Sequence, residues 1–200
     1  MSSNKYLKIL AIAFLVFAFI FCSKKDDRHF NLSNAKVVRN IAHRVLDENI
    51  RFTTAGNFTS DSTISIVAGV EASGRNQFGI QFKLLERVDG EFTLVYSTPV
   101  LNGSFDKCIV NKMKLYRYPG EMIYYNSKDF YMGTGGGEVY LYVINFSHKQ
   151  VYYAHFVVEE HAGAALYLSE NVEEPILKKF FINYFKKDYP SLHLVGSDIK

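Results

Sequence analysis

The chain has 200 residues, with 23 lysines and arginines against 20 aspartates and glutamates, for a formal net charge of +3. A nucleic-acid-binding domain needs a basic excess or a clustered basic stripe, so we expect no nucleic-acid partner. Cys22 and Cys108 are the only cysteines, which excludes a cysteine-based zinc site.

The first segment reads as a signal for export. Lys5 and Lys8 precede an uninterrupted apolar run of 13 residues, from Ile9 to Phe21. This run is shorter than the ~20 residues that cross a bilayer as a helix, and it matches the ~7–15-residue apolar region of a secretory signal. We therefore expect the chain to leave the cytoplasm.

Cys22 ends the apolar run and is followed by the polar tract SKKDD. Residues 1–27 resemble the signal peptide of bacterial lipoproteins, in which the cysteine becomes the lipid-bearing first residue. The polar tract also resembles the surface-export tag of some Gram-negative lipoproteins. The resemblance implies a signal peptide at 1–21, lipid attachment at Cys22, a tether at 22–32, and a location on the outer membrane that can extend to surface display.

Phe21 departs from the lipoprotein pattern, which has a small residue before the cysteine. The alternative is an uncleaved apolar anchor in which Cys22 carries no lipid. Basic residues flank the run on both sides, so they do not set its orientation. Either alternative ties the chain to a membrane and delivers the rest to the cell envelope.

The folded part is expected to begin with a helix whose N-cap is Ser33. Its apolar side chains recur with helical spacing and leave charged residues on the opposite face. These apolar residues are Val37, Val38, Ile41, Ala42, Val45 and Leu46.

Residues 51–60 are polar and predict a loop, after which apolar residues alternate with polar ones as they do in strands. Strands are expected at 63–70, 77–84 and 92–96. Asp89 and Gly90 indicate a hairpin, and the apolar pattern favours a three-residue loop that pairs Leu84 with Leu94.

Further strands are expected at 107–118, 121–126 and 164–168, with a hairpin formed by 139–146 and 151–158. Residues 112–125 weakly resemble FG-GAP propeller repeats, whose loops carry calcium-binding aspartates. The corresponding loop here reads KLYRYPGE, so the resemblance implies neither calcium nor a propeller.

A second amphipathic helix closes the chain, with an apolar stripe formed by Ile176, Leu177, Phe180, Phe181, Tyr184 and Phe185. Residues 33–200 are therefore expected to form a single α+β domain. It would hold an antiparallel hairpin meander of about seven to nine strands, with both helices on one sheet face.

Candidate chemical groups are few. His155, Glu159 and His161 share one face of a strand, but the two histidines are ~20 Å apart along it, too far to hold one ion. We therefore expect no metal and no cofactor. A glycine run at 133–137 could bind an anion, but a strand rather than a helix follows it, which favours a loop.

Nine tyrosines lie between Tyr116 and Tyr153; most are expected to fill the sheet, while exposed ones suit sugar or protein partners. The ligand-binding candidates are Tyr124, Tyr125, Tyr131, Gly135, Gly136, Glu159 and His161. No residue is assigned a catalytic role. We expect a non-enzymatic binding or structural module of the envelope whose partner is a protein or small molecule. The alternative is an envelope hydrolase with Glu159 and His161 at its site.

Overall fold

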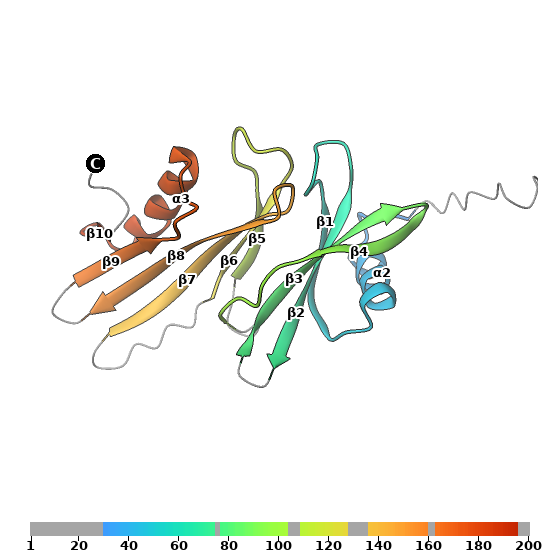
Figure 1. The fold of residues 1–200 in the computed structure, drawn as a ribbon, viewed down its shortest axis with the longest axis horizontal. Helices are drawn as coiled ribbons and strands as arrows, with labels where there is room; N and C mark the ends of the chain where they lie inside the picture. Colours follow the sequence, from blue (N-terminus) through green and yellow to red (C-terminus); the bar gives the residue numbers. More distant parts are fainter. Residues whose placement is uncertain (1–29, 75–76, 104–108, 128–135, 160–162, 196–200) are drawn as a thin grey trace, which may run out of the picture.

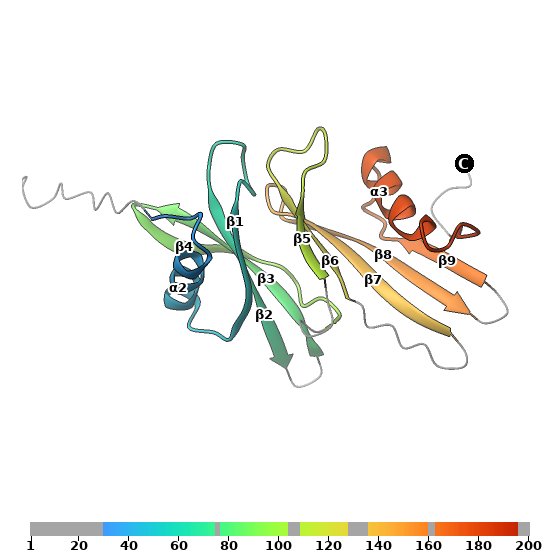
Figure 2. The same ribbon diagram turned by 180° about the vertical axis from the view of Figure 1, so that it is seen from behind.

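The computed structural model describes residues 30–74, 77–103, 109–127, 136–159 and 163–195. Within these residues the chain forms two helices and ten strands, arranged in one sheet of four strands and one of six. Helix α2, the four-stranded sheet, the six-stranded sheet and helix α3 follow one another along the long axis (Figures 1 and 2). The α+β class is confirmed, whereas the expectation of a single sheet is wrong.

The four-stranded sheet, called sheet A, is an antiparallel meander in the order β1-β2-β3-β4. Its strands are β1 (Ile50–Gly56), β2 (Ser65–Gly74), β3 (Gln77–Val88) and β4 (Glu91–Ser97). Helix α2 (Ala35–Leu46) covers the outer face of this sheet and buries Val38, Ile41 and Ala42 against it.

The start of α2 differs from the expectation by one residue. Asn34, not Ser33, is the N-cap, and its Oδ1 accepts hydrogen bonds from the backbone N–H groups of Lys36 at 2.9 Å and Val37 at 3.4 Å. An asparagine amide reaches these donors as well as a serine hydroxyl does, so sequence preference alone does not separate the two neighbours.

Strand β1 lies where a polar loop was expected. Its two threonines, Thr53 and Thr54, are β-branched residues that suit a strand. Its first residue, the buried Ile50, packs in the core beneath α2. Pairing with β2 supplies its backbone hydrogen bonds, so a polar composition is tolerated at this edge of the sheet.

The β3–β4 hairpin also differs from the expectation. Asp89 and Gly90 both have positive φ, at 51° and 92°, and form a two-residue turn that pairs Val88 with Glu91. Leu85 therefore lies opposite Leu94. A register shift then places Leu84 opposite Tyr96, so the irregularity lies inside the strand pair and not at the turn.

The six-stranded sheet, called sheet B, has the order β10-β9-β8-β7-β6-β5 and is antiparallel except for the β9–β10 pair. Its strands are β5 (Ile109–Met113), β6 (Met122–Asn126), β7 (Gly136–Asn145), β8 (Gln150–Glu159), β9 (Gly163–Leu168) and β10 (His193–Val195). The expected β7–β8 hairpin is confirmed. The short β10 was not anticipated.

Helix α3 (Pro175–Lys186) covers the outer face of sheet B and buries Leu177, Phe181 and Phe185. The two helices thus lie on opposite outer faces of the molecule, not on one sheet face. The reason is that both faces of β7 are apolar: Leu141 and Val143 face α3, whereas Ile144 faces sheet A. No helix in the described ranges is long and apolar enough to cross a membrane.

The inner faces of the sheets form a shared core with side chains from both, including Phe82 and Leu84 of sheet A and Ile123 and Ile144 of sheet B. T-shaped aromatic contacts run through this core. The two sheets therefore share buried apolar area, which joins them into one folded unit.

A polar contact also joins the sheets at one side, between the end of β1 and the start of β6. The backbone N–H of Glu121 donates to the Asn57 carbonyl at 2.6 Å, and the Asn57 N–H donates to Glu121 Oε2 at 2.9 Å. Lys112 Nζ lies 3.3 Å from Glu121 Oε1 and donates to the Ala55 carbonyl at 3.1 Å. Gly120, with φ of 73°, permits this approach, because a Cβ there would lie 2.5 Å from the Asn57 carbonyl oxygen.

Candidate functional site

The inner face of sheet B carries two rows of aromatic side chains that cross the strands. In one row Tyr125 of β6, Tyr142 of β7 and Tyr153 of β8 are register partners. In the other, Tyr140 of β7 faces His155 of β8, which faces Tyr167 of β9. We call the five residues Tyr140, Tyr142, Tyr153, His155 and Tyr167 the aromatic face.

The rings of this face are in continuous contact. Tyr142 stacks on Tyr125 at a centroid distance of 5.6 Å and on Tyr140 at 5.9 Å. Tyr140 stacks on the imidazole of His155 at 4.3 Å, with an angle of only 3° between the ring planes. Tyr153 is tilted by about 50° against both tyrosines of β7. Cross-strand packing therefore fixes the positions of these rings before any partner arrives.

Exposure increases along each row, away from sheet A. Tyr125 is fully buried and Tyr142 is 6% exposed, whereas Tyr153 is 40% and Tyr167 is 42% exposed. Sheet A contributes core contacts to β5, β6 and β7, but none to β9. The aromatic face is thus the part of the inner face of sheet B that extends past its cover.

One pair of ionisable side chains among the described residues lies on this face. His155 Nε2 is 2.6 Å from Glu138 Oε2, and the two side chains are 24% and 56% exposed. Glu138 is the diagonal neighbour of His155 across the β7–β8 pair. The carboxylate orients the imidazole against the Tyr140 ring and places one polar group at the edge of the aromatic face.

A groove borders the aromatic face where the loop after β4 meets sheet B. Its wall is formed by residues 99–102 and its floor by Tyr140, Tyr142, Val151 and Tyr153, with a volume of ≈ 460 Å³. The Asn102 N–H donates to the Tyr142 hydroxyl at 3.2 Å, which holds the wall against the floor.

Two tyrosines of this site, Tyr140 and Tyr142, have a raised pKa. Burial raises the pKa of Tyr142 to about 12, and the Asn102 N–H offsets part of that rise. The pKa of Tyr140 is also raised, first by burial and then by the negative charge of Glu138. Both groups therefore present neutral O–H groups to any partner.

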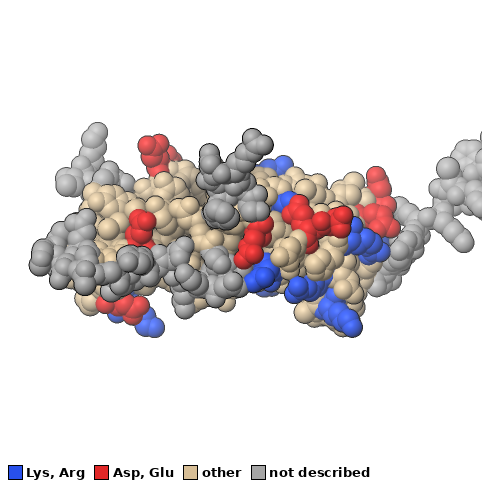
Figure 3. All heavy atoms as spheres, turned by 90° about the horizontal axis from the view of Figure 1, so that it is seen from below, with Lys and Arg blue, Asp and Glu red and all other residues tan. Residues whose placement is uncertain are grey.

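Charged side chains are unevenly distributed on one side of the molecule. On the side seen in Figure 3, lysine, arginine, aspartate and glutamate cluster over α2 and sheet A, whereas few lie over sheet B. On this side, therefore, sheet B presents a surface with fewer charges than sheet A does.

The sequence-predicted candidates lie in several places. Tyr124 faces α3 and packs on Phe180 at 5.8 Å, while Tyr125 is a core residue whose hydroxyl donates to the Asn102 carbonyl at 2.7 Å. Gly136 and Glu159 are register partners at the ends of β7 and β8. Cys22, Tyr131, Gly135 and His161 lie outside the described residues. None of the candidates that the structure describes belongs to the aromatic face, although Tyr125 stacks on Tyr142 at its buried end.

The Glu138–His155 pair was missed in the sequence because the expected hairpin turn was displaced by one residue. A turn at 147–150 would place Tyr142 opposite His155. The observed turn at 146–149 pairs Asn145 with Gln150, and counting outward from it places Tyr140 opposite His155 and Glu138 diagonal to it. Within the described ranges, no cluster of three or more histidine, cysteine or acidic side chains could hold a metal ion.

Comparisons with protein-family models, with curated proteins and with solved structures found no match to this chain.

Proposed function

We propose that this chain is a lipid-anchored protein of the cell envelope whose folded part is a non-enzymatic binding module. The aromatic face of sheet B is its docking surface, and the partner is another protein. The lipoprotein-type segment around Cys22 supports the location, and the inner face of sheet B supports the binding role.

The observation that carries the binding role is the pair of aromatic rows that run from the core into solvent. Tyr153 and Tyr167 keep two fifths of their surface exposed although both sit on strands next to buried rings. Tyrosine is enriched in the energetically dominant parts of protein interfaces, because a rigid ring buries a large area at low entropic cost. Here packing has already ordered the rings, which lowers the cost of binding further.

The ring geometry favours a protein over a sugar. A sugar platform needs an exposed ring face, but the faces of Tyr140 and His155 lie against each other at 4.3 Å. Tyr140, Tyr142 and His155 contact one another through their faces, so these three rings offer edges and polar atoms to a partner and not a flat platform. Such a mixed apolar and hydrogen-bonding surface matches a protein backbone and its side chains.

Site-specific photo-crosslinking in intact cells tests the docking surface. A photoreactive residue replacing Tyr167 should give a discrete cross-linked protein. The same residue replacing Tyr116, which is 80% exposed on a distant turn, should not give that product. Introducing Tyr153→Ala should abolish the Tyr167 cross-link. Identical products from both positions, or binding of purified glycan strands that Tyr153→Ala removes, would overturn the protein-docking proposal.

The anchor is tested separately. Cys22→Ala should abolish incorporation of labelled fatty acid and release the protein from membranes, because acyl chains supply the anchoring area. Wild-type protein that takes up no label would show that Phe21 blocks processing, and the uncleaved anchor would replace the lipoprotein proposal.

A further inference from the structure

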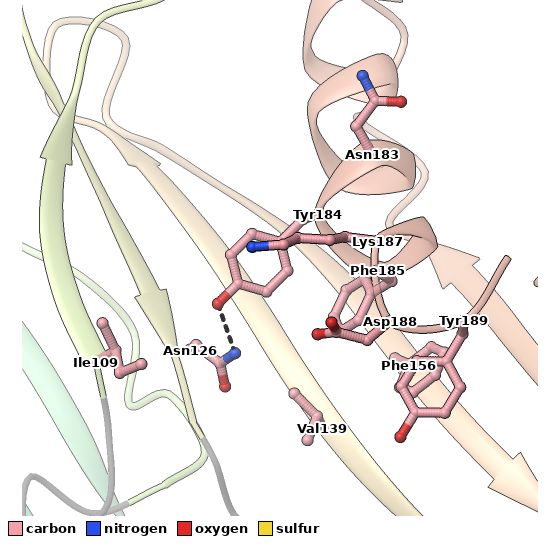
Figure 4. Close-up of a pocket in the computed structure, with 10 residues that line it drawn as sticks. All are labelled: Ile109, Asn126, Val139, Phe156, Asn183, Tyr184, Phe185, Lys187, Asp188 and Tyr189. Atoms are coloured by element: carbon pink, nitrogen blue, oxygen red, sulfur yellow. Dashed lines mark hydrogen bonds between the residues drawn. The ribbon is translucent and has the colours of Figure 1, made fainter.

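A second concave site lies on the opposite face of sheet B, beneath the end of helix α3 (Figure 4). Its volume is ≈ 680 Å³, within the range of roughly 300–1,000 Å³ that small-molecule sites occupy. Strands β5 to β8 form one wall, with Ile109, Val139 and Phe156 as its apolar part. The proposed docking surface uses none of these residues.

The cavity exists because α3 is held to one side of the sheet. Phe185 at the end of the helix stacks on Phe156 of β8 at 4.5 Å, and Tyr189 packs on the same ring at 4.7 Å. Strands β5 and β6 lie farther along the sheet, and Tyr184 reaches toward them without filling the space (Figure 4). Val139 on β7 is too small to fill the remainder.

One polar pair spans the cavity from sheet to helix. Asn126, which is 8% exposed, donates from Nδ2 to the Tyr184 hydroxyl oxygen at 2.8 Å. Among the described residues the Tyr184 O–H has no acceptor of its own, so it retains a hydrogen bond to donate to a ligand oxygen. This is the arrangement of a ligand site: a mostly apolar lining with a few fixed polar groups.

Among the described residues that line the cavity, one carries a positive charge and one a negative charge. Lys187 and Asp188 follow the last turn of α3 and both line the opening, whereas Asn183 points away from it (Figure 4). A ligand with a single carboxylate would meet the like charge of Asp188, and a ligand with a single ammonium would meet that of Lys187. A zwitterionic head group matches both charges at once.

We propose that this cavity binds a small zwitterion with an aromatic or branched apolar body, the chemical class of an apolar amino acid or short peptide. The body occupies the space lined by Phe156, Phe185 and Val139. The carboxylate accepts from Tyr184 and faces Lys187, while the ammonium group faces Asp188. Because these residues lie on the outer face of sheet B, occupancy is independent of partner docking on the inner face.

The absence of tryptophan from the chain gives a direct test. Free tryptophan is titrated with the full chain in lipid nanodiscs and excited where tyrosine does not absorb, so that all emission comes from the ligand. Its fluorescence anisotropy should rise to saturation, and empty nanodiscs should give no saturable rise. A signal that fails to saturate with the protein present would overturn the proposal.

Competition identifies the head group. Phenylalanine should displace tryptophan at lower concentration than hydrocinnamate, which lacks the ammonium group, or phenethylamine, which lacks the carboxylate. Each lost charge should weaken binding about two- to fivefold, the range of exposed ion pairs. Equal displacement by all three compounds would show that the cavity does not select for a zwitterionic head group, and the proposed ligand class would be wrong.

Variants locate the ligand. Val139→Phe fills the cavity and should weaken tryptophan binding at least tenfold, while Tyr184→Phe keeps the ring contacts and removes only the hydroxyl. Lys187→Gln should weaken phenylalanine and hydrocinnamate but not phenethylamine, with Lys179→Gln on the same helix as the matched control. Unchanged binding in both Val139→Phe and Tyr184→Phe, each with a wild-type melting temperature, would place the ligand elsewhere and overturn the proposal.

Discussion

Sheets A and B share one plan, a helix on the outer face and an apolar inner face, but they carry different side chains inward. Sheet A contributes Val67, Ile80, Phe82 and Leu84, all nearly or fully buried. Sheet B contributes Ile123 and Ile144 to the same core. It also carries tyrosines and His155, which extend from the core toward solvent where the strands pass beyond sheet A.

The difference follows from strand number. A six-stranded sheet is wider than the four-stranded sheet it packs on, so part of its inner face is left without a cover. Aliphatic side chains there would form an exposed apolar patch, whereas tyrosines keep an apolar body and add a hydroxyl that water or a partner can bind. Sheet A thus serves as the cover and sheet B as the surface that is available for binding.

The largest effect should come from the outer core of sheet B. Phe181 of α3 is fully buried against sheet B, so Phe181→Ala should lower the free energy of unfolding by ~3–5 kcal/mol. Phe180, half-buried one position earlier, should cost clearly less when replaced by alanine. Urea denaturation measures both. A loss under about 1 kcal/mol for Phe181→Ala would mean that α3 is peripheral and that only sheet A has a covered outer face.

The second effect tests the tyrosines between the sheets through pH. Burial raises the pKa of Tyr142 from 10.0 to about 12, so the unfolded chain loses this proton before the folded one does. The stability from the neutral hydroxyl is fully present below about pH 10 and is lost as pH rises toward 12, by at most ~1.4 kcal/mol for each pH unit.

Urea denaturation of wild type and Tyr142→Phe across this alkaline range measures the effect. The variant should lose less stability per pH unit, because it has no hydroxyl at that position to titrate. Parallel pH profiles for the two proteins would show that Tyr142 titrates as it does in the unfolded chain. The part of sheet B that sheet A covers would then be as accessible to solvent as the uncovered part.

The third effect concerns the polar contact that joins the sheets. Glu121→Ala should cost about 1–3 kcal/mol, since it leaves the Asn57 N–H without its side-chain acceptor and Lys112 without its carboxylate. Glu173→Ala, at an exposed position before α3, is the matched control and should be near neutral. If denaturation shows equal stability for both variants, the apolar core alone holds the two sheets together.

Local patterns predicted most of the elements, and what they missed depended on partners distant in the chain. The stripe of α3 and the β7–β8 hairpin follow from the spacing of neighbours such as Leu177 and Phe181. Strand β1 reads as a loop because its polar residues form a strand only when β2 pairs with them. The strands of sheets A and B have similar hydropathy patterns, and these patterns do not show which strands pair and which pack face to face. The sequence therefore predicted one sheet where there are two.

The same limit applies to the binding surface. Tyrosine content pointed to sheet B, but exposure of Tyr153 and burial of Tyr125 depend on where sheet A ends. The width of each sheet depends on how all of its strands pair, and the spacing of residues along the chain does not predict it.

The smallest effect separates the two helices by how they begin. The side chain of Asn34 caps α2. Helix α3 starts at Pro175, and its N-cap residue, Glu174, makes no side-chain capping hydrogen bond. Asn34→Ala should therefore cost ~1 kcal/mol, Asn34→Gly only a few tenths, and Glu174→Ala close to nothing. Ser33→Ala is the control for the neighbouring residue, and thermal denaturation resolves these differences when all four variants share one background.

A larger loss from Ser33→Ala than from Asn34→Ala would move the N-cap back by one residue. A loss of ~1 kcal/mol from Glu174→Ala would show that α3 depends on its own cap and not mainly on the phenylalanines packed against sheet B.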